Sequence, residues 1–360
     1  ARTWFYKAII GHERELEQAQ MCLARPDINN VLIVGEPGVG KESIVEGLAR
    51  RVYLGKALPE INFFRVVMLD MVSILTRITN PEEVESVLDR IFQESIIAGN
   101  IILVIKDFHN YIGIDVNKPG IVDISAIIGK YLQMPNFRFI GMTDYTGLHT
   151  KIEKNPALLE QFNKVEVGEV SEMETIRILQ NTALELENKY KVFITYPSIR
   201  ELVVLAGRYI PSVPFPKKAI DLLQDVAVYV ARSKPYKIIR PDDIAKVIST
   251  KTSIPVGKLG FQEKETLLNL EKLIHERIVN QNEAVRGISI AMRRARAGIG
   301  SKKRPMGSFL FLGPTGVGKT ETSKALAQIY FGGEQKMIRL DMSEFQAVAD
   351  IPRLLGVIGQ

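Results

Sequence analysis

The sequence contains a glycine-rich loop twice, and each copy follows a short apolar run that is typical of a buried strand. The first copy reads GEPGVGKE and the second reads GPTGVGKT, and each continues into a segment with helical periodicity. Glycines at this spacing let backbone amides turn inward around phosphate oxygens, and the helix that follows adds its positive dipole end. The chain is therefore predicted to have two phosphate-binding loops, Gly35 to Lys41 and Gly313 to Thr320.

The second loop has every group that the phosphate-binding motif requires. Lys319 would neutralise the β and γ phosphates of a nucleotide, and the hydroxyl of Thr320 would ligate Mg²⁺. We therefore expect this loop to bind ATP with Mg²⁺. The predicted nucleotide contacts here are Gly313, Pro314, Thr315, Gly316, Val317, Gly318, Lys319, Thr320 and Glu321.

The first loop keeps the glycines and the lysine but has Glu42 where the metal-binding hydroxyl should stand. Ser43 is one residue further along the helix, which turns its side chain by about 100°, so it is not an obvious substitute. A carboxylate at position 42 either binds the metal directly or repels the phosphates, and the sequence leaves both readings open. The predicted nucleotide contacts at this loop are Gly35, Glu36, Pro37, Gly38, Val39, Gly40, Lys41 and Glu42.

Hydrolysis of ATP also needs carboxylates at the end of a neighbouring buried strand, one for the metal and one to orient water. The candidate strand ends in the sequence Ile105-Lys106-Asp107-Phe108-His109, which offers a single carboxylate. Asp107 is therefore the only catalytic candidate at this strand end. Lys106 is most simply interpreted as a strand-end charge that reaches solvent, and His109 as a hydrogen-bonded loop residue.

Apolar runs alternate with helical periodicity on both sides of the first loop. In the helix that follows this loop, Ile44, Leu48 and Val52 recur at a spacing of four, which places them on one face. Alternating strands and helices predict an α/β fold, with a mostly parallel sheet between helices. The expected elements are a helix from Glu13 to Arg25 and strands at Val31 to Val34, Val66 to Leu69, Ile101 to Ile105, Phe137 to Ile140 and Val165 to Val167.

Helix-start patterns replace the strand patterns in the middle of the chain and predict a small helical domain. They pair Ser171 with Glu174, Ser198 with Glu201, and Pro241 with Asp242, and a further helix is expected from Pro216 to Arg232. We therefore predict a large α/β domain over residues 1–170 and a small helical domain over residues 171–250.

The chain then repeats its own opening. A helix around Glu263 to Arg277 and a second helix precede a predicted strand at Phe309 to Leu312 and the second loop. The segment VMLDM at Val67 to Met71 returns as IRLDM at Ile338 to Met342. Residues 251–360 are thus predicted to be the first part of a second α/β nucleotide-binding domain.

Composition excludes several other classes of protein. The single cysteine, Cys22, rules out an internal disulfide framework and fits a reducing compartment such as the cytoplasm. The longest apolar runs, such as Ile101 to Ile105, are far shorter than the roughly 18 residues of a membrane span. The net charge is +6, and the sequence contains a local basic cluster. Aromatic residues do not interleave with this cluster, so nucleic acid is not the expected partner. That cluster consists of Arg293, Arg294, Arg296, Lys302, Lys303 and Arg304.

Taken together, the motifs resemble those of the Clp unfoldases, which have two AAA+ modules. In chain order they are IIGHERELEQA, GEPGVGK, RYI, FPKKAIDLL, IPVGKL, ERIVNQNEAV, GSFLFLGPTGVGKTE and RLDMSEF. The resemblance covers nearly the whole chain and is most specific from Ser253 to Phe345. It implies adenine pockets lined by Ile9 and Ile10 in the first module, and by Ile278 and Val279 in the second. It also implies hexameric rings that use ATP to pull protein substrates through a pore, with a protease as partner in some members.

The first module departs from this family at the positions where chemistry is expected. Loss of an arginine that reaches the neighbouring subunit's nucleotide typically costs about 10³ to 10⁵ in rate. Thr143 still offers a polar group where the family has a sensor residue. No coiled-coil insertion separates AIDLL from IPVGKL, so a protease-feeding or otherwise adapted relative fits better than a disaggregase. The departures are Glu42 in the loop, Lys106 in the acidic pair, Glu160 and Gln161 at the arginine positions, and Asn80 at the pore aromatic.

These observations lead to three competing hypotheses. We favour a Clp-like AAA+ ATPase whose first module binds ATP without efficient hydrolysis, while the second module hydrolyses it. The 360-residue chain alone is then expected to be weakly active or inactive, because the second acidic pair would lie beyond Gln360. A non-hydrolysing scaffold or assembly protein that uses nucleotide as a structural ligand is the alternative, and a nucleic-acid motor ranks last.

Overall fold

The computed structural model describes residues 9–78, 81–113, 123–252, 254, 256, 261–297 and 305–345. These residues form two compact units. The first contains the described residues up to 185 together with 211–223, and the second contains 186–210 and the described residues from 224 onward. No helix in the described part of the chain is both long and apolar enough to cross a membrane.

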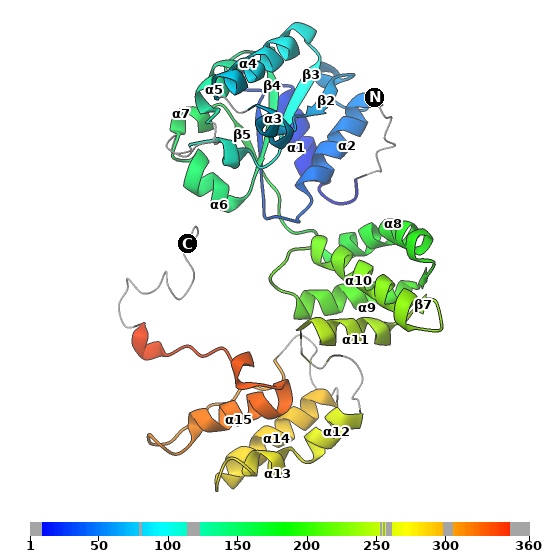
Figure 1. The fold of residues 1–360 in the computed structure, drawn as a ribbon, viewed down its shortest axis with the longest axis vertical. Coiled ribbons are helices and arrows are strands. Elements are labelled where there is room, and N and C mark those ends of the chain that lie inside the picture. Colours follow the sequence, from blue (N-terminus) through cyan, green and yellow to red (C-terminus); the bar gives the residue numbers. More distant parts are fainter. Residues whose placement is uncertain are drawn as a thin grey trace. The chain divides into compact units, whose positions relative to one another are not determined.

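A five-stranded parallel sheet forms the centre of the first unit (Figure 1). The strand order is β2-β3-β4-β1-β5, and every neighbouring pair is parallel. The carboxyl ends of parallel strands meet at one edge, which is where open α/β sheets bind their ligands. The strands are β1 (Val31–Val34), β2 (Arg65–Met68), β3 (Ile101–Ile105), β4 (Arg138–Thr143) and β5 (Asn163–Glu166).

Helices cover both faces of this sheet, so its strands are apolar on both sides. On one face Leu32, Leu103 and Phe139 belong to a core with α4 (Pro81–Ala98) and α5 (Ser125–Leu132). On the other face the alternate residues Val31, Ile102 and Ile140 belong to a core with α1 (Glu13–Leu23) and α2 (Lys41–Tyr53). The predicted parallel sheet between helices is confirmed, and it positions the first loop at the end of β1.

Short elements connect these strands and helices. Near the carboxyl edge of the sheet, η2 follows β3, and α6 with the π-helical turn η3 follows β4. The connecting elements are η1 (Pro59–Ile61), α3 (Met71–Arg77), η2 (Phe108–Tyr111), α6 (Tyr145–Gly147), η3 (Leu148–Ile152) and α7 (Pro156–Leu159).

The middle of the chain is helical, as predicted. The reciprocal cap between Ser171 and Glu174 is formed, with the Ser171 amide donating to Glu174 Oε2 at 3.0 Å and the Glu174 amide donating to Ser171 Oγ at 3.3 Å. The predicted start at Ser198 is wrong, because Thr195 takes the N-cap position and Pro197 stands in the first turn. The elements are α8 (Glu172–Tyr190), β6 (Phe193–Ile194), α9 (Tyr196–Tyr209), α10 (Lys217–Ser233), β7 (Ile238–Ile239) and α11 (Pro241–Thr252).

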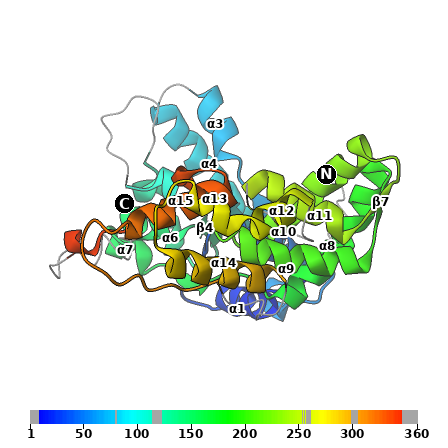
Figure 2. The same ribbon diagram turned by 90° about the horizontal axis from the view of Figure 1, so that it is seen from below.

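The second copy of the opening forms a helical cluster with its own apolar core. The helix expected from Glu263 to Arg277 is broken at Asn269 into α12 and α13, and α13 packs against α14 and α15 (Figures 1 and 2). The elements are α12 (Phe261–Leu268), α13 (Leu270–His275), α14 (Asn282–Arg296), α15 (Lys319–Phe331), η4 (Glu334–Lys336) and η5 (Met342–Glu344).

The strand predicted at Phe309 to Leu312 is not formed. The segment from Ile338 to Met342, which repeats the sequence around β2, forms no strand either. Phe309 and Phe311 line a cavity against the helices, whereas Leu310 on the opposite side is 83% exposed. In the first unit, β1 pairs only with β4 and β5, and β2 pairs only with β3, all of which come later in the chain. By that topology both segments of the second copy lack partner strands within the described residues, so the ladder hydrogen bonds cannot form.

Candidate nucleotide-binding sites

The first phosphate loop follows β1 and closes around its own lysine. The Gly35 amide donates to the carbonyl of Thr143 at 3.2 Å, which ties the loop to β4. Lys41 donates to the carbonyl oxygens of Gly35 and, at 3.3 Å, of Glu36. Burial lowers the pKa of Lys41, although the nearby carboxylates, led by Asp144, oppose that shift. A bound phosphate would take the place of these two carbonyl oxygens as the partner of the Lys41 ammonium group.

The second phosphate loop holds its lysine in a similar way. Lys319 donates to the carbonyl oxygens of Gly313 and Pro314 at 2.8 and 2.7 Å. As in the first loop, the glycine before the lysine is in the left-handed region, at φ 93° for Gly318 and φ 108° for Gly40. Each helix then begins at the lysine itself. The two predicted phosphate-binding loops are therefore built alike, although the second lies in an incomplete sheet.

A polar side chain from the preceding segment holds each loop, and the sequence analysis did not identify it. His12 is left-handed at φ 57°, and its Nε2 donates to the carbonyl of Val39 at 2.8 Å. Gln281 is left-handed at φ 60°, and its Nε2 donates to the carbonyl of Val317 at 3.0 Å. His12 comes three residues after Ile9, and Gln281 comes three residues after Ile278. This shared position in the two repeats is a signal from which the sequence could have identified them.

The predicted adenine-pocket residues are not equivalent within each pair. Ile9 packs on α2, where a Cβ on Gly47 would lie 3.2 Å from it. Ile278 is buried in the core of the second copy, whereas Val279 is 82% exposed. Ile10 is half-buried. Each pair therefore has one residue in the adjacent core, and contact of these residues with adenine remains a prediction.

At the metal end of the first site, two of the departures from the family meet. Lys106, at the end of β3, forms an ion pair with Glu42, in the first turn of α2. Both side chains are about half exposed, at 51% for Lys106 and 54% for Glu42. The hydrogen bond to Glu42 raises the pKa of Lys106. Lys106 is therefore not merely a strand-end charge that reaches solvent, and Glu42 is not a free carboxylate.

The donor groups at this point do not suit Mg²⁺, which prefers oxygen ligands and carboxylates in particular. Lys106 presents an ammonium group where the family's acidic pair begins, and Glu42 is engaged by that ammonium. Across the described ranges, no cluster of three or more His, Cys, Asp or Glu side chains could hold a metal ion. The second loop does offer a suitable oxygen ligand, since the Thr320 hydroxyl is exposed in the first turn of α15.

Asp107 and Thr143, the catalytic and sensor candidates, lie near the first loop. Asp107 is left-handed at φ 50°, and its charge favours the protonated forms of Lys41 and Lys106. Thr143 is fully buried at the end of β4, and its Oγ1 lies 3.0 Å from His109 Nδ1. Its hydroxyl also donates to the carbonyl of Asp144 at 3.1 Å. The polar group of the sensor candidate is therefore engaged within the protein.

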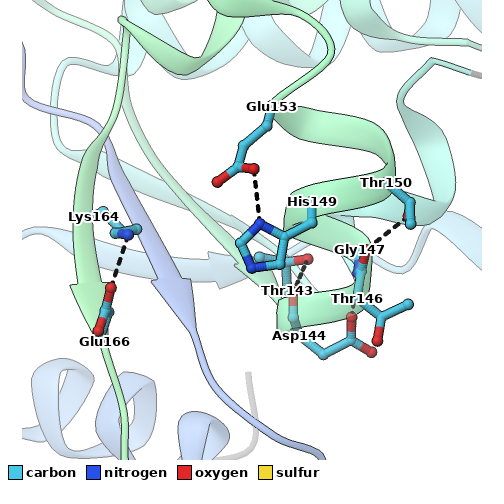
Figure 3. Close-up of polar contacts among 9 residues, drawn as sticks. All are labelled: Thr143, Asp144, Thr146, Gly147, His149, Thr150, Glu153, Lys164 and Glu166. Carbon is cyan, nitrogen blue, oxygen red and sulfur yellow. Dashed lines mark hydrogen bonds and ion pairs between the residues drawn. The ribbon is translucent and has the colours of Figure 1, made fainter. Parts of the chain in front are cut away.

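Glycine is required where His109 reaches Thr143. A Cβ on Gly147 would lie 2.2 Å from His109 Cγ, so no larger residue fits beside the imidazole. Figure 3 shows the surroundings of Gly147, whose amide donates to Asp144 Oδ1 at 2.6 Å. On the exposed side of this region, His149 pairs with Glu153 (Figure 3).

A second cation outside the loop lies against the first site. The side chain of Lys217, at the start of α10, passes so close to Gly38 that a Cβ there would lie 2.6 Å from Lys217 Cδ. Lys217 Nζ pairs with Asp221 at 3.1 Å, and Lys218 pairs with Glu169 at 3.0 Å. Both lysines belong to the sequence motif PKKAIDLL, but the contact of Lys217 with the loop appears only in the folded chain.

The remaining predicted positions are away from the loop or outside the described residues. Glu160 is exposed, and Gln161 accepts a hydrogen bond from Asn30 Nδ2 through its carbonyl at 3.2 Å. Asn80 and the basic residues 302–304 lie outside the described residues. Arg293 pairs with Glu271 at 2.5 Å, so this part of the basic cluster serves contacts between helices.

Three family descriptions match successive parts of the chain. Residues 31–165 match "ATPase family associated with various cellular activities (AAA)", and residues 171–272 match "AAA lid domain". Residues 304–357 match "AAA domain (Cdc48 subfamily)". The first and third matches each contain one of the two phosphate loops, so the repeat seen in the sequence is also a repeat of family matches.

Individual relatives are similar to nearly the whole chain. "Chaperone protein ClpB" of Oceanobacillus iheyensis is 34% identical over 97% of the chain, and "Negative regulator of genetic competence ClpC/MecB" of Bacillus subtilis is 35% identical over 97%. The chain spans about half the length of these relatives, at 50% of each. A cryo-EM structure of closed Hsp104 with ATPγS and FITC-casein superposes with a TM-score of 0.82 at 30% identity, over 97% of the chain and 60% of that structure's chain.

Proposed function

The chain belongs to the Clp family of AAA+ ATPases, and from this premise we propose that it works in protein unfolding or remodelling through two unequal nucleotide sites. The first site binds ATP without efficient hydrolysis and serves assembly. The second site binds ATP with Mg²⁺ and hydrolyses it. Residues 1–170, 171–250 and 251–360 act as the first α/β domain, its helical lid and the beginning of the second α/β domain.

One observation carries the proposed inequality of the sites. At the first site, Glu42 and Lys106 neutralise each other at the point where a metal and its carboxylate are expected. At the second site, the loop has both Lys319 and the hydroxyl of Thr320. Both loops hold their lysine in a similar way, so we place the difference in the groups that hold the metal and polarise water. These groups govern turnover rather than phosphate binding.

The proposed partners follow from the relatives. Hsp104 was observed with ATPγS and FITC-casein, and a 34% identical Staphylococcus aureus relative carries the name "ATP-dependent Clp protease ATP-binding subunit ClpC". We accordingly propose protein substrates, self-association into a hexameric ring, and a protease as a further partner. Glu160 and Gln161 offer no cation to a neighbouring subunit's nucleotide, which fits slow turnover in the first ring of sites.

Steady-state ATP hydrolysis by a protein that carries the second module to its end tests this proposal. We expect Lys319→Ala to lower turnover by about 10²-fold or more, because it removes a cation from the transferring phosphoryl group. Lys41→Ala should reduce assembly and leave the second site's chemistry in place. Turnover that survives Lys319→Ala and disappears in Lys41→Ala would reverse the assignment.

A third result would favour a different class of function. If the protein with a complete second module binds ATP but shows no turnover above background, and Lys319→Ala changes only binding, nucleotide is a structural ligand. The protein would then be a nucleotide-dependent scaffold within the same fold. The ion pair between Glu42 and Lys106 is compatible with that outcome, so turnover at the second site is the discriminating measurement.

A further inference from the structure

The ion pair between Glu42 and Lys106 joins the segments that follow β1 and β3, two strands that are not neighbours in the sheet. Glu42 follows the loop after β1, Lys106 follows β3, and β4 lies between those strands. The pair therefore spans the carboxyl edge beside the phosphate loop, where the β and γ phosphates of a bound nucleotide would lie. Each departure alone would damage the site. Together they place one positive and one negative charge in contact.

We propose that the first site binds nucleoside triphosphate without Mg²⁺, with the Lys106 ammonium, anchored by Glu42, donating to the phosphate oxygens that the metal would hold at the second site. The inference rests on the proposed function, since it assumes that the first loop binds nucleotide. It concerns the ligand itself, which here is the free triphosphate rather than its magnesium complex.

The chemistry of the ammonium group supports this role. A lysine ammonium has three N–H donors, and the bond to Glu42 uses one of them. The side chain is 51% exposed, so the remaining donors are accessible to a phosphate at the loop. The hydrogen bond to Glu42, with a smaller contribution from the charge of Asp107, raises the pKa of Lys106, so this group stays a cation at neutral pH. Lys41 and Lys106 then place two ammonium groups beside the phosphates, in addition to Lys217, which pairs with Asp221.

The carboxylate of Glu42 is compatible with phosphate binding in this arrangement. An unpaired carboxylate in the first turn of α2 would repel the phosphates that the loop amides attract. Paired with Lys106, it carries no net charge into the site and instead orients the ammonium. The sequence left two alternatives open for Glu42, metal binding and repulsion of phosphate. In this proposal Glu42 does neither and instead holds the Lys106 ammonium in place.

Calorimetric titration of ATP into the 360-residue chain carrying Lys319→Ala tests the inference, because that substitution disables the second loop. The titration is run once with excess Mg²⁺ and once with excess EDTA. We expect the apparent Kd of the first site to be at least about tenfold weaker in excess Mg²⁺ than in EDTA, because Mg²⁺ withdraws the free triphosphate that this site binds. An apparent Kd that is the same in both buffers, or weaker in EDTA, overturns the inference.

A charge-exchange variant provides the complementary test. Glu42→Thr together with Lys106→Asp restores the hydroxyl and the carboxylate of a metal site, so its ATP affinity should become at least about tenfold weaker in EDTA than in Mg²⁺. An exchange variant whose ATP affinity does not fall in EDTA contradicts the role given to the ion pair. If this variant does not fold, the comparison of buffers with the unexchanged pair still decides the question.

A matched control separates the site from general charge effects. Lys251 and Asp225 form an ion pair of similar exposure on helices of the middle region, 48% for each side chain, with a length of 2.7 Å. Asp225→Thr with Lys251→Asp changes net charge by the same amount and should leave ATP binding unaltered in both buffers. Absence of binding in both buffers for the unexchanged pair would overturn nucleotide binding at the first loop itself, which distinguishes failure of the proposed function from failure of this inference.

Discussion

At the scale of single residues, the two phosphate loops are held in the same way by different side chains. His12 and Gln281 are both left-handed helix caps, and both donate a hydrogen bond to the carbonyl of the loop valine, Val39 or Val317. His12 is well buried, with its side chain only 7% exposed. This contact fixes the position of the loop amides before any nucleotide arrives.

His12→Ala should weaken ATP binding at the first site by about three- to tenfold, the usual worth of one hydrogen bond. His12→Gln should retain most of the affinity, because an amide at this position makes the equivalent bond in the second loop. Titration of ATP into the Lys319→Ala background measures both variants. Equal losses in the two would show that the hydrogen bond to Val39 is not what His12 contributes.

Gly38 is the more closely surrounded of the two left-handed glycines in the first loop. It is left-handed at φ 98°, and the side chain of Lys217 occupies the space that a Cβ would need. Gly38→Ala should lower ATP affinity at the first site by about tenfold or more, since the backbone conformation costs about 1–2 kcal/mol for an L residue and Lys217 must also move. The same titration detects the loss.

Gly168 provides the control for this substitution. It follows β5, and a Cβ there would meet nothing within 4 Å. Gly168→Ala should therefore bind ATP as the unsubstituted chain does. If Gly38→Ala also binds with unchanged affinity, the loop does not act as a rigid phosphate cradle.

The sequence predicted the loop residues but not how the site's side chains combine. Phosphate-loop geometry depends on consecutive residues, so Gly35 to Lys41 could be identified from spacing alone. The contact between Glu42 and Lys106 depends on the order of strands in the sheet, and the two substitutions were consequently interpreted as separate losses. The contact between Lys217 and Gly38 depends in the same way on where α10 begins.

At the scale of elements, continuous apolar runs predicted the strands of the first sheet well. The predicted bounds of β1 and β3 agree with the structure. β4 extends to Thr143, further than predicted, because Gly141 and Thr143 interrupt the apolar run while still pairing with β1. The apolar run at Phe309 to Leu312 had equally strong strand character, but a strand also requires a partner. None lies beside it among the described residues.

A charged contact secures the start of α10 at the element scale. Glu169 accepts a hydrogen bond from the Phe215 amide at 2.6 Å and pairs with Lys218 at 3.0 Å. Burial opposes ionisation of Glu169, but the Phe215 and Lys218 contacts outweigh it, and the pKa of Glu169 in the folded chain is lowered. A lowered folded pKa stabilises the fold above the unfolded value, and this stabilisation disappears as the pH falls through the folded pKa.

Glu169→Gln should therefore lower the Tm at pH 7 but have progressively less effect as the pH falls below 4.5, the ordinary value for this group. Glutamine can still accept from the Phe215 amide, so the comparison isolates the charge. Thermal unfolding of both proteins across acidic pH measures the difference. Glu94→Gln, which removes the exposed pair with Arg90, is the control and should change little at any pH. A Tm difference for Glu169→Gln that grows in acid would contradict the assignment.

At the scale of the whole molecule, one nucleotide-binding design occurs twice with different chemistry. Both copies have the left-handed cap, the loop and the helix beginning at the lysine, and the family matches recur around both loops. The repeat was visible in the sequence because the motifs return in the same order. The chain covers about half of its curated relatives, and its second copy has a helical core but no formed sheet within the described residues.

The central claim is that the first site holds ATP without consuming it. The most direct test is to incubate the Lys319→Ala chain with labelled ATP and Mg²⁺, remove free nucleotide, and identify the nucleotide that remains bound after several minutes. This time is long enough for about 10³ turnovers of a typical enzyme. Intact ATP recovered with the protein, and lost when Lys41→Ala is added, is the predicted result. Recovery of ADP, or of no nucleotide at all, would contradict the claim.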